Sequence, residues 1–225
     1  AVPTSLTLTA VNLSSMSVQW NQNGNPLTPP TSYQLLISAD QNFATYSTSE
    51  TFVLNATTLT LNANTSYYYK VSAYNKGGGQ SAYTGAIASF TLSASPGVVS
   101  YTVNRTSVSV TLSGNNNPQG TEIWITTNNF EMSTSSTGVM GGGNTSLVIL
   151  NLTPATTYTV QARAVNYNGL ASSATSVANI TTKSNPITVA GFNVYTTSAS
   201  IQVNADGNPN GTQIVVSTGS DTNFA

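Results

Sequence analysis

Residues 152–166 read LTPATTYTVQARAVN, and this stretch decides the fold class of the chain. From Tyr158 onward, Val160, Ala162 and Ala164 alternate with polar side chains. Alternation with a period of two is typical of a β-strand that buries one face. The leucine, proline and threonines before it form a turn signal. The stretch therefore predicts a long strand that is entered from a tight bend.

The same pattern occurs earlier in the chain at a fixed distance. Tyr67 and Asn75 precede Tyr158 and Asn166 by 91 residues each (158−67 and 166−75). An Asn-Pro dipeptide recurs at nearly the same spacing, at residues 25–26, 117–118 and 208–209. A fixed period of this length indicates one module in tandem. We expect modules at residues 1–95 and 96–185, with prolines stiffening the joints near 96 and 186.

A third module begins at residue 186, and about 40 residues of it are present. They are expected to supply three strands, and three strands cannot bury a core by themselves. The interpretation leaves two alternatives open for residues 186–225. The module is truncated, or a neighbouring chain completes it by strand addition.

Alternation also marks the other strands of the first repeat. Expected strands lie near residues 6–10, 16–20, 33–37, 59–61, 67–73 and 87–92. No useful window has helical periodicity. About seven short strands per repeat, separated by regular turn signals, favour a two-sheet sandwich.

Residues 152–166 resemble the E–F region of a fibronectin type III domain, in which a bend after strand E leads into strand F. Residues 61–67 are a looser copy, with asparagine where the family has proline, and Trp20 stands where the family has a core tryptophan. The resemblance implies an all-β chain of tandem fibronectin-type-III-like, immunoglobulin-like β-sandwiches. It also implies that Tyr67 and Tyr158 are structural tyrosine corners, whose hydroxyls bind the backbone. The fold alone does not specify a function.

The composition argues against most kinds of chemistry. Only 5% of the residues are charged, the net charge is −1, and there is no histidine or cysteine. Ordinary soluble domains have about 25% charged residues. The absence of a basic patch argues against nucleic acid and membrane surfaces as partners. The scattered acids and the missing His and Cys predict no enzyme, no cofactor and no metal site. The loop at residues 206–210 looks like a calcium loop, but turn chemistry explains it.

Low charge permits association, so a protein partner or self-association is expected, with a glycan as a weaker alternative. If inward residues alternate as above, one outward face carries a partner-binding surface. It belongs to strand C, near residues 33–37, strand F, near residues 67–73, and their equivalents in the second repeat. Its residues are Leu36, Tyr68, Tyr74, Trp124 and Arg163. A register shifted by one residue would instead place Trp124 in the core, and the pattern leaves both interpretations open.

The sequence therefore favours a non-enzymatic, extracellular or cell-surface repeat protein with a structural or adhesive role. A self-assembling filament or appendage subunit is one form of this hypothesis. The alternative is a spacer or accessory binding region of a large secreted polysaccharide-degrading enzyme.

Overall fold

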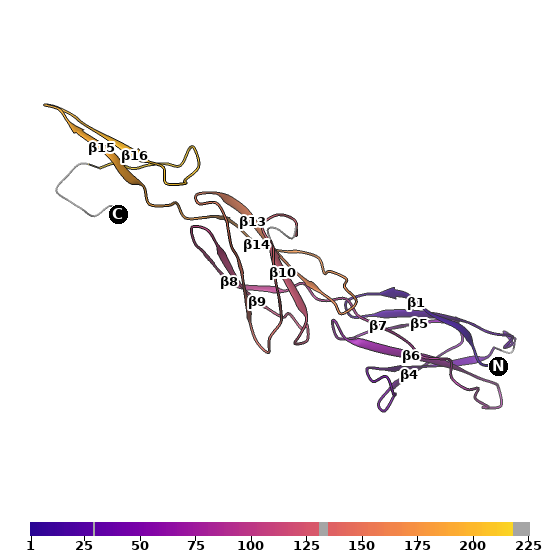
Figure 1. Cartoon of the computed structure of the whole chain (residues 1–225). Helices are drawn as coiled ribbons and strands as arrows, with labels where there is room; N and C mark the ends of the chain where they lie inside the picture. Colours follow the sequence, from indigo (N-terminus) through magenta and orange to yellow (C-terminus); the bar gives the residue numbers. More distant parts are fainter. Residues whose placement is uncertain (29, 131–134, 218–225) are drawn as a thin grey trace.

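The computed structural model describes residues 1–28, 30–130 and 135–217, and all of its regular elements there are β-strands. They form two sandwiches and a hairpin that follow one another along an extended chain (Figure 1). The all-β class predicted from the alternating pattern is confirmed.

Seven strands make up the first sandwich. They are β1 (Thr4–Val11), β2 (Met16–Asn21), β3 (Ser32–Ser38), β4 (Ser47–Thr51), β5 (Asn55–Thr58), β6 (Ser66–Tyr74) and β7 (Ile87–Phe90). One sheet has the order β1-β2-β5 and the other has the order β4-β3-β6-β7. All neighbouring strands are antiparallel.

The two sheets of the first sandwich share one core. Met16, Val18 and Trp20 alternate along β2 and are at most 2% exposed. They belong to the same buried cluster as Leu35 on β3 and Val71 on β6. Every second side chain of these strands faces the opposite sheet, because successive side chains of a strand point to opposite faces.

The second sandwich repeats this topology. Its strands are β8 (Gly97–Val103), β9 (Val108–Ser113), β10 (Glu122–Thr126), β11 (Ser135–Val139), β12 (Thr145–Ile149), β13 (Thr157–Val165) and β14 (Thr175–Thr181). The sheet orders are β12-β9-β8 and β11-β10-β13-β14. Leu112 takes the place of Trp20 in the core.

One expected strand of the first repeat was misplaced. The prediction placed it near residues 59–61, whereas β5 ends at Thr58 and Leu59 is 66% exposed. Thr60 has a φ of 59°, which breaks the extended backbone directly after the strand. Leu61 still packs against the core, and this explains why its apolar character resembled a strand position.

Two of the three strands expected in the third segment lie among its described residues. β15 (Thr188–Val194) and β16 (Ala199–Asn204) form a hairpin, and no described residue after Asn204 belongs to a strand. In both sandwiches the next strand, β3 or β10, is held by hydrogen bonds to two neighbours. The described part of the third segment offers no such neighbours, so residues near Ile214 have nothing to pair with.

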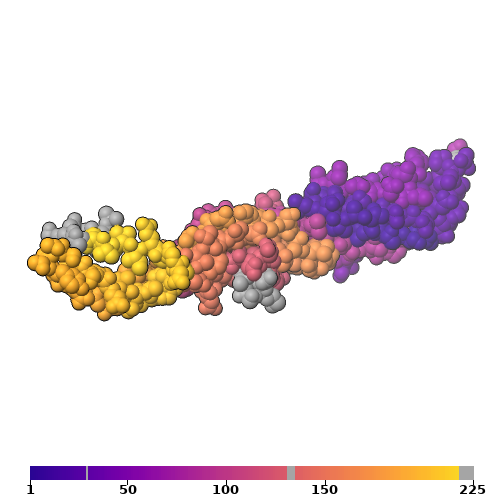
Figure 2. Space-filling model, turned by 90° about the horizontal axis from the view of Figure 1, so that it is seen from above, coloured from indigo at the N-terminus to yellow at the C-terminus, as the bar shows by residue number. Residues whose placement is uncertain are grey.

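The sandwiches and the hairpin are arranged end to end. In the space-filling view the first sandwich, the second sandwich and the hairpin lie in a row (Figure 2). The amino terminus lies on the first sandwich, and the hairpin lies at the other end of the row (Figure 1). The surfaces that meet between neighbours are therefore the ends of the sandwiches.

Candidate functional site

The outward face of the second sandwich carries Trp124 and Arg163. These residues are opposite one another on β10 and β13, and neither belongs to the buried core cluster. The guanidinium carbon of Arg163 lies 5.2 Å from the centre of the Trp124 ring and 4.1 Å from that of Phe130. The indole nitrogen of Trp124 donates to a Glu122 carboxylate oxygen at 2.6 Å. Trp124 is thus on the outward side, where it stacks with a cation.

The outward face of the first sandwich differs from the predicted surface. Leu36 was expected to be exposed, but it is only 4% exposed. It is opposite Lys70, whose ammonium nitrogen lies 4.1 Å from the centre of the Phe43 ring. The loop that carries Phe43 thus covers this part of the sheet. Two backbone N–H groups of that loop donate to the Asp40 carboxylate, which lowers the pKa of Asp40.

Tyr68 and Tyr74 lie on the same outward face and are partly exposed. The Tyr74 hydroxyl donates to the side-chain oxygen of Gln34 at 3.3 Å, and the Tyr83 hydroxyl lies 2.5 Å from the same oxygen. The five predicted surface residues therefore divide between the outer sheets of two sandwiches. Tyr74, Trp124 and Arg163 already contact side chains of their own sandwich.

The two tyrosines predicted to form corners bind the backbone. The Tyr67 hydroxyl accepts a hydrogen bond from the Asn62 N–H at 3.0 Å. The Tyr158 hydroxyl accepts one from the Thr153 N–H at 2.9 Å. Each bond ties the start of a long strand to the bend before it.

Replacing Tyr158 with phenylalanine should lower the free energy of unfolding of the second sandwich by about 1 kcal/mol, because one net hydrogen bond is lost. Chemical denaturation followed by circular dichroism measures this loss. Tyr67→Phe is the matched change in the first sandwich. Equal stability of Tyr158→Phe and the unchanged chain would contradict a structural role for the hydroxyl.

Polar side chains form the end-to-end contact between the two sandwiches. Asn64, which is 1% exposed, donates from its side-chain nitrogen to the Thr121 hydroxyl at 2.8 Å. Its side-chain oxygen accepts from the Tyr167 N–H at 2.9 Å. One asparagine of the first sandwich therefore binds two loops of the second, and both the nitrogen and the oxygen of its buried amide have a partner.

A second asparagine makes the reciprocal contact. Asn166 is 3% exposed, and its side-chain nitrogen donates to the Thr91 carbonyl at 3.2 Å. The rings of Phe90 and Tyr167 have centroids 5.2 Å apart and planes inclined by 60°. Asn168 adds a bond to the Ser89 hydroxyl at 3.1 Å. Polar and aromatic contacts thus hold this joint together from both sides.

The repeated Asn-Pro dipeptide has a structural role at each amino-terminal end. The Asn117 side chain accepts from the Ala94 N–H at 2.8 Å and donates to the Ala94 carbonyl at 2.7 Å. Asn208 binds the backbone of Asn185 in the same way. These bonds fasten the incoming chain to the turn that follows β9 or β16. The sequence showed the dipeptide as a repeat marker, but did not show what its amide binds.

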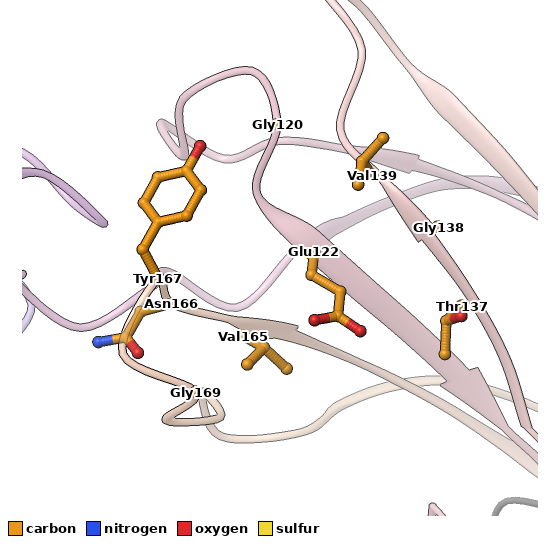
Figure 3. A pocket seen from close by; sticks show the side chains of 9 residues that line it. All are labelled: Gly120, Glu122, Thr137, Gly138, Val139, Val165, Asn166, Tyr167 and Gly169. Carbon is orange, nitrogen blue, oxygen red and sulfur yellow. The ribbon is translucent and has the colours of Figure 1, made fainter.

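Figure 3 shows a shallow pocket on the second sandwich beside this joint. Glu122, Thr137, Val139 and Tyr167 are among its lining residues. Glu122 is its only acidic residue, and its carboxylate already accepts from Trp124. Among the described residues, no three His, Cys, Asp or Glu side chains lie close enough together to hold a metal. The pocket offers no pair of groups for acid–base catalysis.

Two antiparallel sandwiches in series, with a tyrosine corner in each, define a tandem array of immunoglobulin-like domains. The family model for the fibronectin type III domain matches residues 1–90. This match covers the first sandwich, and the two sandwiches together have the fold of a fibronectin type III tandem repeat. The predicted resemblance is confirmed.

A solved structure of two domains agrees with this fold. The chain is similar to a segment of two fibronectin type III domains from chicken tenascin, with 19% identity and a TM-score of 0.54, covering 80% of this chain and 99% of that one. It also matches the fibronectin type III domain of human fibronectin type III domain containing protein 3, with 26% identity and a TM-score of 0.37 over 41% of this chain and 85% of that one. No curated protein matches the sequence.

Fibronectin type III domains are structural or binding modules that generally have no catalytic activity. They commonly mediate protein interactions and are common in extracellular proteins. The described residues contain no helix that is long and apolar enough to cross a membrane.

Proposed function

We propose that the chain is part of a non-enzymatic extracellular repeat protein whose modules form a stiff structural or adhesive rod. The observation that carries this proposal is the joint between the two sandwiches. Asn64 and Asn166 each bury a side-chain amide that bonds across the joint. Bending would break these bonds and leave buried polar groups unsatisfied, which costs about 1–3 kcal/mol for each group. A joint of this kind favours one relative orientation.

The composition supports the same role. With 5% charged residues and a net charge of −1, the surface does not repel copies of itself. The rod has no chemistry of its own in this proposal, and its function is to hold or space whatever lies at its ends. A glycan partner has less support, because the ring of Trp124 already stacks with Arg163.

Small-angle X-ray scattering tests the stiffness of the joint. For the whole chain in solution, we expect a scattering curve that one extended arrangement of the two sandwiches fits. The maximum dimension should stay unchanged between low and high salt, because the joint has no ion pair among the described residues. A curve that requires many different angles between the sandwiches would contradict the proposal.

The C-terminal hairpin supports self-assembly as the finer form of this proposal. Ile201 and Val203 on β16 take the places that Val110 and Leu112 have on β9. Val110 and Leu112 are 0% exposed, whereas Ile201 is 41% exposed. Side chains that form the core of a complete sandwich are here open to solvent and favour a cover.

We propose that strands of a neighbouring subunit provide this cover. Sedimentation analysis of the whole chain should then show oligomers whose share rises with protein concentration. Ile201→Lys should shift the distribution to monomers, because a charge cannot be buried in the completed core without a large cost. Val148→Lys, on the 42% exposed outer side of β12, is the control and should change nothing. A monomer at all concentrations would contradict the self-assembly proposal.

A further inference from the structure

The amino-terminal end of the second sandwich binds the first sandwich through three groups. The Thr121 hydroxyl accepts from Asn64, the Tyr167 N–H donates to Asn64, and the Asn166 side chain donates to the Thr91 carbonyl. The incoming chain is fastened beside them by Asn117, which binds Ala94. These residues show, within this chain, how one module packs against the next.

The first sandwich has equivalent groups at its own amino-terminal end. Thr31 corresponds to Thr121: each hydroxyl donates to the carbonyl of the proline in the Asn-Pro dipeptide, at 3.0 and 2.8 Å. Asn25 corresponds to Asn117. It accepts from the Ala1 nitrogen at 2.6 Å and donates to the Ala1 carbonyl at 2.9 Å. Ala1 therefore occupies the place of Ala94.

Asn75 corresponds to Asn166 and forms the same internal turn. Its side-chain oxygen accepts from the Gly77 and Gly79 N–H groups, both at 2.9 Å. The oxygen of Asn166 accepts from the same two positions of its own loop, at 3.0 and 2.8 Å. Asn75 is thus held in the same conformation, with its side-chain nitrogen turned away from the turn.

The outward-directed groups of this end have no partner. Asn75 is exposed, whereas Asn166 is 3% exposed. In the part of the chain that the structure describes, neither the Asn75 side-chain nitrogen nor the Lys76 N–H donates a hydrogen bond. Lys76 follows Asn75 as Tyr167 follows Asn166. We call Asn25, Thr31, Asn75 and Lys76 the acceptor end; a shallow groove that also includes Pro26 and Gln80 lies there.

We propose that the acceptor end is a docking surface for the carboxy-terminal end of a further fibronectin type III domain of the same kind as the first sandwich. This inference rests on the proposed rod function. The docking domain would have asparagine at the position of Asn64 and phenylalanine at that of Phe90. Its asparagine would bind the Thr31 hydroxyl and the Lys76 N–H, and its last strand would lead into the place of Ala1. The Lys76 side chain would lie near its phenylalanine ring, as Tyr167 lies near Phe90.

The joint between the two sandwiches indicates that a further domain, and not a second copy of this chain, docks on the acceptor end. The carboxy-terminal end of the first sandwich is already covered by the second sandwich through Asn64. The second sandwich has Ala155 at the position of Asn64, so it has no side-chain amide at this position. Consistently, no hydrogen bond of the described residues joins residues 97–181 to β15 or β16. A module that docks on the acceptor end therefore needs asparagine at this position.

Amide hydrogen exchange by NMR tests the proposal on the whole chain and on a chain extended before Ala1 by a second copy of residues 1–93. In the extended chain, exchange of the Lys76 N–H should slow by roughly tenfold, the effect of one net hydrogen bond. The Tyr167 N–H is the internal reference, because its bond to Asn64 exists in both chains. Asn64→Gly in the added copy alone should return Lys76 to fast exchange. Asn75→Asp, which keeps the turn acceptor but removes the donor, should weaken protection.

The outcomes separate this inference from the rod proposal. Slow exchange at Lys76 in the extended chain, together with fast exchange in the unextended chain, supports the docking surface. Fast exchange at Lys76 with slow exchange at Tyr167 overturns the docking surface and leaves the rod proposal intact. Fast exchange at both positions overturns both. Slow exchange at Lys76 that grows with the concentration of the unextended chain overturns the proposed occupant in favour of a second copy.

Discussion

Leu35→Ala is expected to lower the free energy of unfolding of the first sandwich by about 3 kcal/mol. Leu35 is 0% exposed and lies between the two sheets, in the cluster that contains Met16 and Trp20. Removing three carbon atoms leaves a cavity that the rigid sheets cannot close. Native-state hydrogen exchange should show faster exchange of the β6 amides by about two orders of magnitude.

Ile125→Ala is the matched change in the second sandwich, because Ile125 is also 0% exposed and occupies the same position of strand C. It should speed exchange of β13 amides by a similar factor. Each variant is expected to affect mainly its own sandwich, since the two core clusters share no residue. Equal loss of protection in both sandwiches from Leu35→Ala alone would contradict two separate cores.

Asn64→Gly is expected to loosen the joint between the sandwiches, at a cost of about 2 kcal/mol. The change removes the donor to Thr121 and the acceptor of the Tyr167 N–H. Glycine is chosen because Asn64 has a φ of 45°, which glycine adopts without strain. Exchange of the Tyr167 amide should accelerate by more than tenfold, and small-angle scattering should show a wider range of shapes.

Ala155→Gly is the control for the backbone effect of glycine. Ala155 occupies the equivalent position of the second sandwich with a φ of 49°, and its side chain makes no polar contact. This variant should leave the exchange rate of the Tyr167 amide and the arrangement of the first two modules unchanged. If Asn64→Gly and Ala155→Gly affected the Tyr167 amide equally, the Asn64 side chain would not hold the joint.

The outward surface shows where prediction from sequence succeeded in part. The alternating pattern put Trp124 and Arg163 on one side of the sheet, and the structure places them there in contact. The same pattern made Leu36 an exposed residue, and it is buried. Period-two alternation predicts which face of a strand a residue lies on. It does not predict whether a loop, here the one with Phe43 that follows β3, folds over that face.

The asparagines of the joint were visible in the sequence only as repeat markers. Asn75 and Asn166 have the same place in the repeat and form the same turn bonds. One is exposed and the other is buried, because only Asn166 faces another module. No local pattern distinguishes them, since the distinction comes from contacts between residues 75 positions apart in the chain (166−91).

By itself, the sequence determined the all-β class, the repeat and the tyrosine corners' positions, because strand alternation and turn residues are local features of the chain. Only the tertiary structure decided which asparagine amides hold modules together and which stay free. It also decided that the core residues of the C-terminal hairpin remain exposed. Those outcomes depend on which surfaces meet in space, and a buried polar group is stable only where a distant partner completes its hydrogen bonds.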